Sequence, residues 1–288
     1  MNIGIIGHGI VGKAIEVGFR DHTKIFINDP KLGDKSISKA AIVTDCEFIF
    51  VGVPTPYNVK EKCVDDSIIT GIIDELDQLA YTFHNNPIVI VKSAIVPRVV
   101  KEWINDCYSI QLVISPEYLT ERSFHHDFVN QKVMVLGGLE KNCQKVVELY
   151  RDYSICNRQC KIGICSAEEA ALIKYMENSF LAMKCIFNNQ FKRFYDKHFK
   201  TELHDGFNQL MDVFYLDERM GLFPFKYRVP GPDGDFGYGG KCLPKDVQAI
   251  IHEGNNQGTP LTLLERVVEI NNIIRTNRDW EFIQGALS

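Results

Sequence analysis

The sequence predicts an α/β fold in which a doubly wound parallel sheet over residues 1–165 is followed by a mainly helical domain over residues 166–288. Short β-branched runs alternate with helical stretches in the first 165 residues, and a glycine-rich turn follows the first run. From Ser166 onward, long helical segments dominate. A chain of 288 residues also exceeds the size at which one hydrophobic core usually stops growing, which favours two compact units.

Six short apolar runs are the candidate strands of the first domain. They cover residues 3–6, 24–28, 48–53, 88–92, 112–115 and 132–137. Each ends near a polar or glycine-bearing turn. In an open parallel sheet the ligand crevice lies beyond the carboxyl ends of the strands. We therefore expect binding and catalytic residues in these turns.

A capping box opens the second domain. In the segment 166–169 the Ser166 hydroxyl and the Glu169 carboxylate can satisfy backbone amides at a helix start, and the helix should run to about Phe194. On a helical wheel, one face is apolar and is expected to be buried: Ile173, Met176, Phe180, Met183 and Phe187. The opposite side carries Ala171, Lys174, Asn178, Leu181 and Cys185. Further helices are expected near 202–214 and 261–277, with a Gly/Pro-rich loop over 221–245 between them.

Composition excludes several classes of protein. A hydrophobic content of 45% with 24% charged residues is ordinary for a soluble globular protein, and a net charge of −5 argues against a nucleic-acid partner. The N-terminus has no signal-peptide pattern, and no apolar run is long enough for a membrane span. We therefore expect a cytoplasmic protein without a membrane partner. Nine cysteines without paired spacing then indicate free thiols.

The first motif is the turn Gly7-His8-Gly9-Ile10-Val11-Gly12, which follows a predicted strand and opens a helix. Its glycines permit a tight turn and let the backbone approach a pyrophosphate at the helix N-terminus. Asp29 ends the next strand, where a carboxylate accepts hydrogen bonds from ribose hydroxyls and repels a 2′-phosphate. Together they predict a Rossmann-type domain that binds NAD rather than NADP. The alternative is a glycine turn in another kind of α/β protein.

The second motif is a glycine-rich loop over residues 231–246 that contains Cys242 between Lys241 and Lys245. Five glycines in ten residues give a backbone that could wrap a ligand and present amides to it, and nearby cations favour the thiolate. A flexible surface loop with an incidental cysteine is the alternative. The other eight cysteines are expected to be buried. Cys156, Cys160 and Cys165 fit no common zinc spacing, so no metal is expected.

Several segments in series resemble one family. They are Phe236-Gly237-Tyr238-Gly239-Gly240-Lys241-Cys242-Leu243-Pro244-Lys245-Asp246, Gly52-Val53-Pro54-Thr55-Pro56, Ser115-Pro116-Glu117-Tyr118-Leu119-Thr120-Glu121, and Lys174 with Asn178. The chain resembles the UDP-glucose/GDP-mannose dehydrogenases from residue 3 to about 276. The Cys242 loop is highly specific to that family, and the other segments support it by occurring in the family's order.

The resemblance implies a four-electron oxidation that uses two NAD⁺ and converts the alcohol of a nucleotide sugar to a carboxylate, with UDP-glucose as the expected substrate. Cys242 would capture the aldehyde as a thiohemiacetal and carry the later thioester. Lys174 and Asn178, one helical turn apart, would stabilise the oxyanion or hold water. Asp246 would act as a base or orienting group, and Glu117 would assist hydrolysis. For Lys174 and Asn178 the alternative is a solvated surface side chain, and for Glu117 and Glu121 it is a pair of solvated carboxylates on a loop.

The resemblance also implies which residues bind the cofactor and the substrate. Expected at the NAD are Gly7, Gly9, Ile10, Val11, Gly12, Asp29, Thr55, Ser93, Glu121 and Lys245. Expected at the nucleotide sugar are Tyr118, Leu119, Phe236 and Gly239, with Lys226 or Arg228 near the substrate phosphate or a neighbouring subunit. A homodimer formed through the helix at 261–274 is expected from the family's architecture, although its apolar spacing equally fits core packing.

Two features depart from the family pattern. The segment Lys92-Ser93-Ala94-Ile95-Val96-Pro97 has Ala94 where the family has threonine, so we expect weaker positioning of water and slower hydrolysis. The chain also stops near Trp280, where the family's nucleotide-binding C-terminal domain should begin. Two other functions therefore stay open: a dehydrogenase of a smaller hydroxy acid, and a non-catalytic cofactor-binding subunit.

Overall fold

The structure is a computed structural model that describes residues 1–61, 63–119, 123–199, 206–221 and 228–283. The chain divides into two compact units. The first contains Met1–Thr55 and Val64–Lys174, and the second contains Pro56–Cys63 and Tyr175–Ser288. The short segment 56–63 therefore belongs with the helical unit, although it interrupts the sequence of the sheet unit.

The first unit is built on a seven-stranded sheet with the order β2-β1-β3-β6-β7-β8-β9. All neighbouring strands are parallel except β7 and β8. Their bounds are Asn2–Ile6 for β1, Lys24–Asn28 for β2, Phe48–Val51 for β3, Ile88–Val91 for β6, Gln111–Ile114 for β7, Val133–Gly138 for β8 and Lys161–Cys165 for β9. The expected α/β fold is confirmed, and six of these strands lie where the sequence predicts them. β9 was not predicted.

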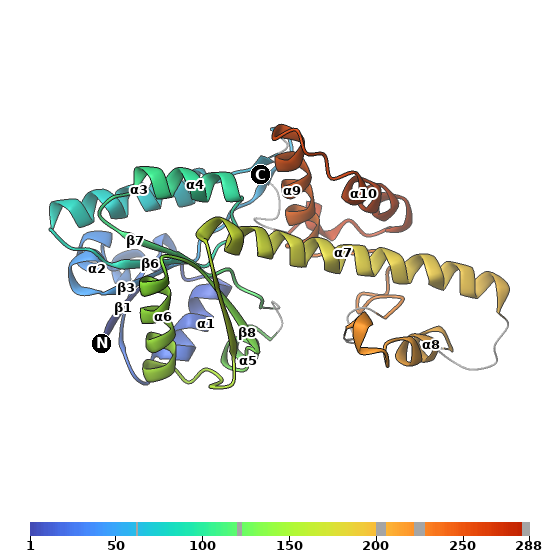
Figure 1. The fold of residues 1–288 in the computed structure, drawn as a ribbon, viewed down its shortest axis with the longest axis horizontal. Helices are drawn as coiled ribbons and strands as arrows, with labels where there is room; N and C mark the ends of the chain where they lie inside the picture. The colour runs from blue at the N-terminus through green and yellow to red at the C-terminus, as the bar shows by residue number, and fades with distance from the viewer. Residues whose placement is uncertain (62, 120–122, 200–205, 222–227, 284–288) are drawn as a thin grey trace. The chain divides into compact units, whose positions relative to one another are not determined.

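Helices cover both faces of this sheet (Figure 1). One face packs against α1 (Ile10–Phe19), α5 (Phe124–Val129) and α6 (Glu140–Tyr153), whose apolar side chains join those of the strands in one core. The other face is covered by α2 (Lys39–Asp45), α3 (Ser67–Thr82) and α4 (Pro97–Asp106). Because both faces are covered, the central strands are buried throughout: β3 and β6 expose almost no side chain.

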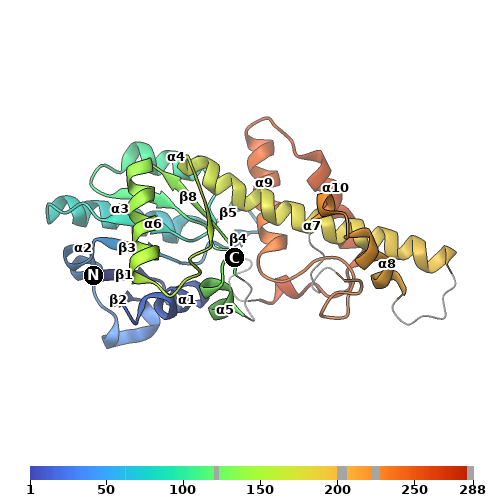
Figure 2. The ribbon, with the colours of Figure 1, turned by 60° about the horizontal axis from the view of Figure 1, so that its bottom comes forward.

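The second unit is mainly helical. It contains most of α7 (Ala167–His198), together with α8 (Gly206–Phe214), α9 (Leu243–Asn256) and α10 (Thr262–Ile274). Side chains of α7, α9 and α10 form one core, and β4 (Tyr57–Asn58), paired with β5 (Cys63–Val64), lies beside α9 (Figure 2). Helix α9 was not predicted. The loop expected over 221–245 ends at Cys242, and α9 begins at the next residue, Leu243. The helix predicted over 261–277 ends earlier, at Ile274.

The start of α7 confirms the predicted capping box. The Ser166 amide donates to Glu169 Oε2 over 2.9 Å, and the Glu169 amide donates to Ser166 Oγ over 3.2 Å. These reciprocal bonds satisfy amides that have no partner within the helix. The helix then continues to His198, four residues beyond the predicted end. None of the helices among the described residues has the length and apolar character needed to cross a membrane.

The predicted buried face of α7 is wrong. Met176 and Phe180 are 61% and 55% exposed, and Phe187 is also exposed. The buried face is the opposite one, and it carries mostly small and polar side chains: Ala171, Tyr175, Asn178, Ala182, Cys185 and Asn189. Small side chains permit close packing against α9 and α10, and the buried amides have hydrogen-bond partners. The periodicity of α7 separates two faces of the helix, but the more apolar face was taken as the buried one, and the structure buries the other.

Candidate active site

The glycine turn after β1 has the geometry of a dinucleotide cradle. Gly7 has φ of 89°, and a Cβ there would approach the carbonyl oxygen of Gly52 to 2.5 Å. A Cβ on Gly12 would collide with the Gly7 carbonyl, so helix α1 can approach the turn only without a side chain at that position. At Gly9, the residue before α1, a Cβ would meet nothing within 4 Å. The open space lies at the helix N-terminus, where a pyrophosphate is stabilised by the helix dipole. The residues present therefore fit a dinucleotide.

Asp29, at the end of β2, is joined to this turn. Its Oδ2 accepts a hydrogen bond from the His8 amide over 2.6 Å, and its Oδ1 accepts one from the Lys31 amide over 2.8 Å. Burial raises the pKa of Asp29, but the hydrogen bonds from these two amides outweigh burial and leave the pKa below its usual value. The His8 ring is itself paired with Glu16 over 2.7 Å. Asp29 is thus an ionised carboxylate that fixes the glycine turn.

The carboxyl ends of β3 and β6 are linked by hydroxyl groups. The Val53 amide donates to Ser93 Oγ over 3.0 Å, and Ser93 Oγ donates to the Val53 carbonyl over 2.7 Å. Thr55 Oγ1 donates to the Ala94 carbonyl over 2.8 Å. Thr55 and Ser93, both selected from the sequence as cofactor residues, therefore lie together where two adjacent parallel strands end.

A buried ion pair lies at the ends of β6 and β7. Lys92 Nζ is 3.1 Å from Glu117 Oε2 and 3.2 Å from Ser115 Oγ, and the two charged side chains are only 1% and 8% exposed. Nearby, Lys174 Nζ lies 4.8 Å from the centre of the Tyr118 ring. The sequence pointed to Glu117, Tyr118 and Lys174 but assigned no role to Lys92. Its position at a strand end was the signal that could have identified it.

The second unit brings together three of the predicted residues. Asn178 Nδ2 on α7 donates to Asp246 Oδ2 over 2.5 Å, and Lys245 Nζ is 2.5 Å from Asp246 Oδ1. All three side chains are buried, and Asp246 is 1% exposed. Cys242 is the residue before α9, and its carbonyl accepts the Asp246 amide over 2.9 Å. Asp246 therefore lies one helical turn beyond the cysteine, with both carboxylate oxygens bound.

Cys242 differs from the other cysteines in its exposure. It is the exposed thiol among the nine cysteines, and it lies at the N-terminal end of α9. Burial raises the pKa of Cys46 and Cys107 to about 12, and that of Cys143 and Cys156 to about 11. Those four thiols stay protonated and inert near neutral pH. A nucleophile must be accessible, and Cys242 meets that requirement.

The loop before Cys242 does not offer all of its amides to a ligand. The amides of Gly237, Tyr238 and Gly240 donate to side chains of this unit: Asn189, Asn271 and Asp279. The expectation that the glycine-rich backbone presents these amides to a ligand is therefore corrected. Glycine is needed here so that the backbone can lie close to those side chains, since a Cβ on Gly237 would overlap Asn271 Oδ1. No sequence motif singled out Asn271 or Asp279.

The remaining predicted residues are placed as follows. Phe236 packs against a small cluster with Phe207, while Leu119 packs against the core of the first unit. Arg228 Nη2 is 3.1 Å from Asp212 Oδ2. Glu121 and Lys226 lie outside the described residues. Within the part of the chain that the structure describes, no group of three metal-ligating side chains is assembled.

Comparison with known proteins gives two family matches. Residues 15–154 match the model of the "UDP-glucose/GDP-mannose dehydrogenase family, NAD binding domain", and residues 168–273 match the model of the same family's central domain. The UDP-glucose 6-dehydrogenase of Rhizobium meliloti (strain 1021) is 28% identical over 239 residues, which cover 80% of this chain and 51% of that protein. The chain spans about half the length of this relative and of two UDP-glucose 6-dehydrogenases of Bacillus subtilis (strain 168) that it also matches.

Solved structures share the fold. A UDP-glucose dehydrogenase from Pyrobaculum islandicum aligns with a TM-score of 0.78 at 20% identity, covering 94% of this chain and 68% of that one. A 3-hydroxyisobutyrate dehydrogenase from Mycobacterium tuberculosis aligns with a TM-score of 0.69 at 14% identity, covering 94% of this chain and 92% of that one. At these identities the likeness establishes the fold and leaves the substrate open.

Proposed function

The chain belongs to the UDP-glucose/GDP-mannose dehydrogenase family, and we propose that it oxidises the C6 alcohol of a nucleotide sugar to the carboxylate, with UDP-glucose as substrate and UDP-glucuronate as product. The observation that carries the proposal is the environment of Cys242. This exposed thiol precedes α9, one turn from the buried Asp246, which Asn178 and Lys245 bind. A smaller dehydrogenase without covalent chemistry would have no need of such a thiol.

NAD is the cofactor, and when bound it would supply the hydride acceptor for each of the two oxidations. The turn Gly7, Gly9, Ile10, Val11 and Gly12 would hold the pyrophosphate through its backbone and the N-terminus of α1. Asp29 would accept hydrogen bonds from the ribose hydroxyls. Thr55, Ser93, Glu121 and Lys245 complete the proposed cofactor residues.

Cys242 makes the four-electron reaction possible on one enzyme. Loss of the first hydride and a proton converts the alcohol to an aldehyde. The Cys242 sulfur then adds to the aldehyde carbon, and the oxygen of the resulting thiohemiacetal takes up a proton. Loss of a second hydride and that proton gives a thioester, and water displaces the thiol to leave a carboxylate. The reaction consumes two NAD⁺ and one water, and the covalent bond keeps the aldehyde from escaping.

Four side chains would support the thiol. Lys174 supplies a positive charge to the oxyanion that forms at the former carbonyl, and Asn178 adds a hydrogen-bond donor one helical turn away. Asp246 orients Asn178 and exchanges protons with the thiol or with water. Glu117, paired with Lys92, assists the attack of water on the thioester. Substrate contacts are proposed for Tyr118, Leu119, Phe236 and Gly239, and for Lys226 or Arg228 at the phosphate.

We further propose that the protein is cytoplasmic and forms a homodimer. Exposed apolar side chains on α7 and α10 support self-association: Met176, Phe180, Phe187, Phe191, Leu263 and Ile273. Exposed apolar side chains grouped along a helix, as on α7, form the kind of surface that another protein usually covers. Light scattering of the purified chain should give twice the monomer mass, and Phe180→Glu should halve it. A monomer in the wild type would refute the dimer.

The function is tested by NADH formation from UDP-glucose with purified protein. We expect two NADH for each UDP-glucose consumed, because both oxidations occur before release. Cys242→Ser should abolish net acid formation, whereas Cys160→Ser, a substitution at a partly buried cysteine in the first unit, should leave the rate unchanged. Absence of NADH with every sugar nucleotide in a panel would refute the proposal and favour a non-catalytic cofactor-binding subunit.

A second candidate is a dehydrogenase of a smaller hydroxy acid. It is favoured by one observation, the likeness of the fold to 92% of the 3-hydroxyisobutyrate dehydrogenase structure, with a TM-score of 0.69. This reaction would release one NADH per substrate and would not use a thiol. Turnover of 3-hydroxyisobutyrate that survives Cys242→Ser would support it, while dependence on Cys242 would support the first proposal.

A further inference from the structure

The loop before Cys242 is held through its backbone by three separate parts of the helical unit. Gly237 donates its amide to Asn189 Oδ1 on α7 over 3.0 Å. Tyr238 exchanges two bonds with Asn271 on α10, since its amide donates to Oδ1 over 2.8 Å and its carbonyl accepts Nδ2 over 3.0 Å. Gly240 donates to both oxygens of Asp279, each at 3.1 Å. Three of the four backbone amides from Gly237 to Gly240 therefore donate to side chains.

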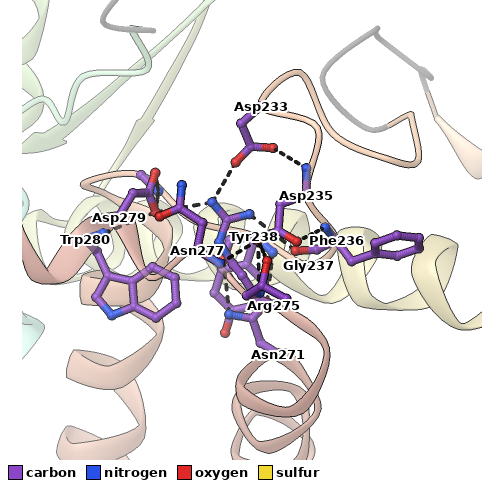
Figure 3. A network of polar contacts seen from close by, with 12 residues as sticks. Asp233, Asp235, Phe236, Gly237, Tyr238, Asn271, Arg275, Asn277, Asp279 and Trp280 are labelled. Carbon is purple, nitrogen blue, oxygen red and sulfur yellow. Dashed lines mark hydrogen bonds and ion pairs between the residues drawn. The ribbon is translucent and has the colours of Figure 1, made fainter.

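Arg275 connects these attachments (Figure 3). Its side chain is 2% exposed, and its Nη2 is 2.6 Å from Asp233 Oδ2 and 3.3 Å from Asp279 Oδ1. Its Nη1 donates to the Phe236 carbonyl over 3.3 Å, and its guanidinium carbon lies 5.9 Å from the centre of the Trp280 ring. The buried guanidinium of Arg275 therefore binds the loop at Asp233 and at Phe236, and it also binds Asp279, which accepts the Gly240 amide.

The glycines of the loop are fitted to this network. A Cβ on Gly237, where φ is 73°, would overlap Asn271 Oδ1, and a Cβ on Gly239 would overlap Arg275 Nη2 and Asp279 Oδ1. The backbone can approach these side chains only because both positions lack a Cβ. The close approach shows that the loop and the network are packed as one piece.

A second attachment lies at the start of the loop. Asp235 Oδ2 accepts hydrogen bonds from the Thr276 amide, the Thr276 hydroxyl and the Asn277 amide, at 3.0, 3.1 and 2.7 Å. Figure 3 shows both Asp233 and Asp235 close to Arg275, with a dashed line from Asp233 to the guanidinium. The chain after α10 is therefore bound to the loop at both Asp235 and Gly240.

We propose that Arg275 and Asp279 are positioning residues that set the direction of the Cys242 thiol, an inference that rests on the proposed function of that cysteine. Asp279 fixes the backbone two residues before Cys242, and helix α9 fixes it immediately afterwards through the bond from the Asp246 amide to the Cys242 carbonyl. Cys242 is held between these two points. Arg275 keeps the Asp279 carboxylate oriented, because a buried guanidinium makes strong, directional hydrogen bonds to the carboxylates beside it.

The test compares Asp279→Ala, Asp279→Asn and Arg275→Lys with wild type. Arg266→Gln is the control, because Arg266 is an exposed α10 residue paired with Glu269. The first measurement needs no substrate: the rate at which iodoacetamide alkylates Cys242, followed peptide by peptide across a range of pH. The second is kcat and KM with UDP-glucose, and the third is NADH affinity as a readout of the first unit.

For Asp279→Ala we expect kcat to fall about 10–100-fold, since misplacement by roughly an ångström has costs of this order. The pH profile of alkylation should shift, and NADH affinity should not change. Asp279→Asn keeps an acceptor for the Gly240 amide, so its kcat should fall less than that of Asp279→Ala. Arg275→Lys keeps the charge but not the fork of donors, so its kcat should fall as well. Arg266→Gln should match wild type.

The two proposals fail in different ways. Wild-type kcat and alkylation profiles in Asp279→Asn and Arg275→Lys, with an active wild type, would overturn the positioning role and leave the function standing. A lower thermal midpoint with unchanged alkylation and kcat would mean a purely structural role and would also overturn it. If wild type oxidises no sugar nucleotide, the function fails, while altered alkylation in the variants would still support positioning. Should Asp279→Ala not fold, the two conservative variants decide the result by the same criteria.

Discussion

Replacing Lys92 by methionine should destabilise the first unit strongly, because it leaves the Glu117 carboxylate without its buried partner. The two side chains are 1% and 8% exposed and lie 3.1 Å apart, so neither charge can be solvated by a small movement. Breaking a buried ion pair by removing one partner costs about 3–5 kcal/mol. For a domain of roughly 150–250 residues, each kcal/mol lowers the melting temperature by roughly 2–4 °C, which gives a loss of about 6–20 °C.

The assay is thermal and urea unfolding followed by the fluorescence of Trp103, which is buried on α4 in the same unit. The chain has two tryptophans, so all variants carry Trp280→Phe to isolate this signal. The double variant Lys92→Met/Glu117→Gln should be more stable than Lys92→Met, because it removes the unpaired charge. Lys39→Met is the matched control. It breaks an ion pair with Glu75 at the surface of the same unit and should cost no more than about 1 kcal/mol.

Two results would refute this reasoning. One is a loss of stability in Lys92→Met no larger than the loss in Lys39→Met, which would mean that the Glu117 carboxylate finds water or another partner. The other is a double variant no more stable than Lys92→Met, which would mean that the cost comes from packing rather than from charge. Either result would also weaken the proposed hydrolytic role of Glu117, since that role needs a carboxylate held in place by Lys92.

Three further predictions concern single residues. Limited iodoacetamide at neutral pH should alkylate Cys242 before Cys143, whose pKa burial raises to about 11, as peptide mass spectrometry would show; earlier labelling of Cys143 would contradict the burial. Burial raises the pKa of Asp235, but hydrogen bonds from Asn277 and its neighbours outweigh burial and lower the pKa, so Asp235 stabilises the fold above about pH 4 and loses this effect as pH falls through its native pKa. Asp235→Asn should therefore flatten the dependence of stability on pH in acid unfolding, and an unchanged curve would contradict this. Ala94→Thr should speed thioester hydrolysis, and equal thioester accumulation in single-turnover mass spectrometry would show that the missing hydroxyl is harmless.

The sheet unit was predictable because its signals are local. Six β-branched runs and one glycine turn follow directly from side-chain sterics and backbone freedom, and each lies where the sequence placed it. The strand β9 (Lys161–Cys165) was missed because a single residue, Ser166, separates this five-residue strand from the long helix. Its side chains are also largely exposed, so it lacks the buried apolar pattern of the other strands. Helix α9 was missed because a glycine-rich segment precedes it and a proline lies near its start. Pro244 lies in its first turn, where proline is tolerated, rather than ending a loop.

The glycine-rich loop marks a limit of motif reasoning. Its composition correctly drew attention to Cys242, but composition cannot say whether a backbone amide faces a ligand or a side chain of the same chain. Here the partners Asn271 and Asp279 lie more than 30 residues away in sequence. Their spacing with Arg275, at four-residue intervals at the end of α10, was the one available signal. It is also common on ordinary helix surfaces, so it could not have been decisive.

The less apolar face of α7 is the buried one for a reason that lies in the candidate site. A helix whose inner face must hold amides at fixed points cannot fill that face with large apolar side chains. Asn178 binds Asp246 and Asn189 binds the Gly237 amide, so the buried face carries these two amides and small residues that permit close approach. The large apolar residues then lie outside, as Met176 and Phe180 do. The assumption that the most apolar face is the inner one therefore fails on the helix that carries the chemistry, because there the requirements of a site conflict with those of a simple core.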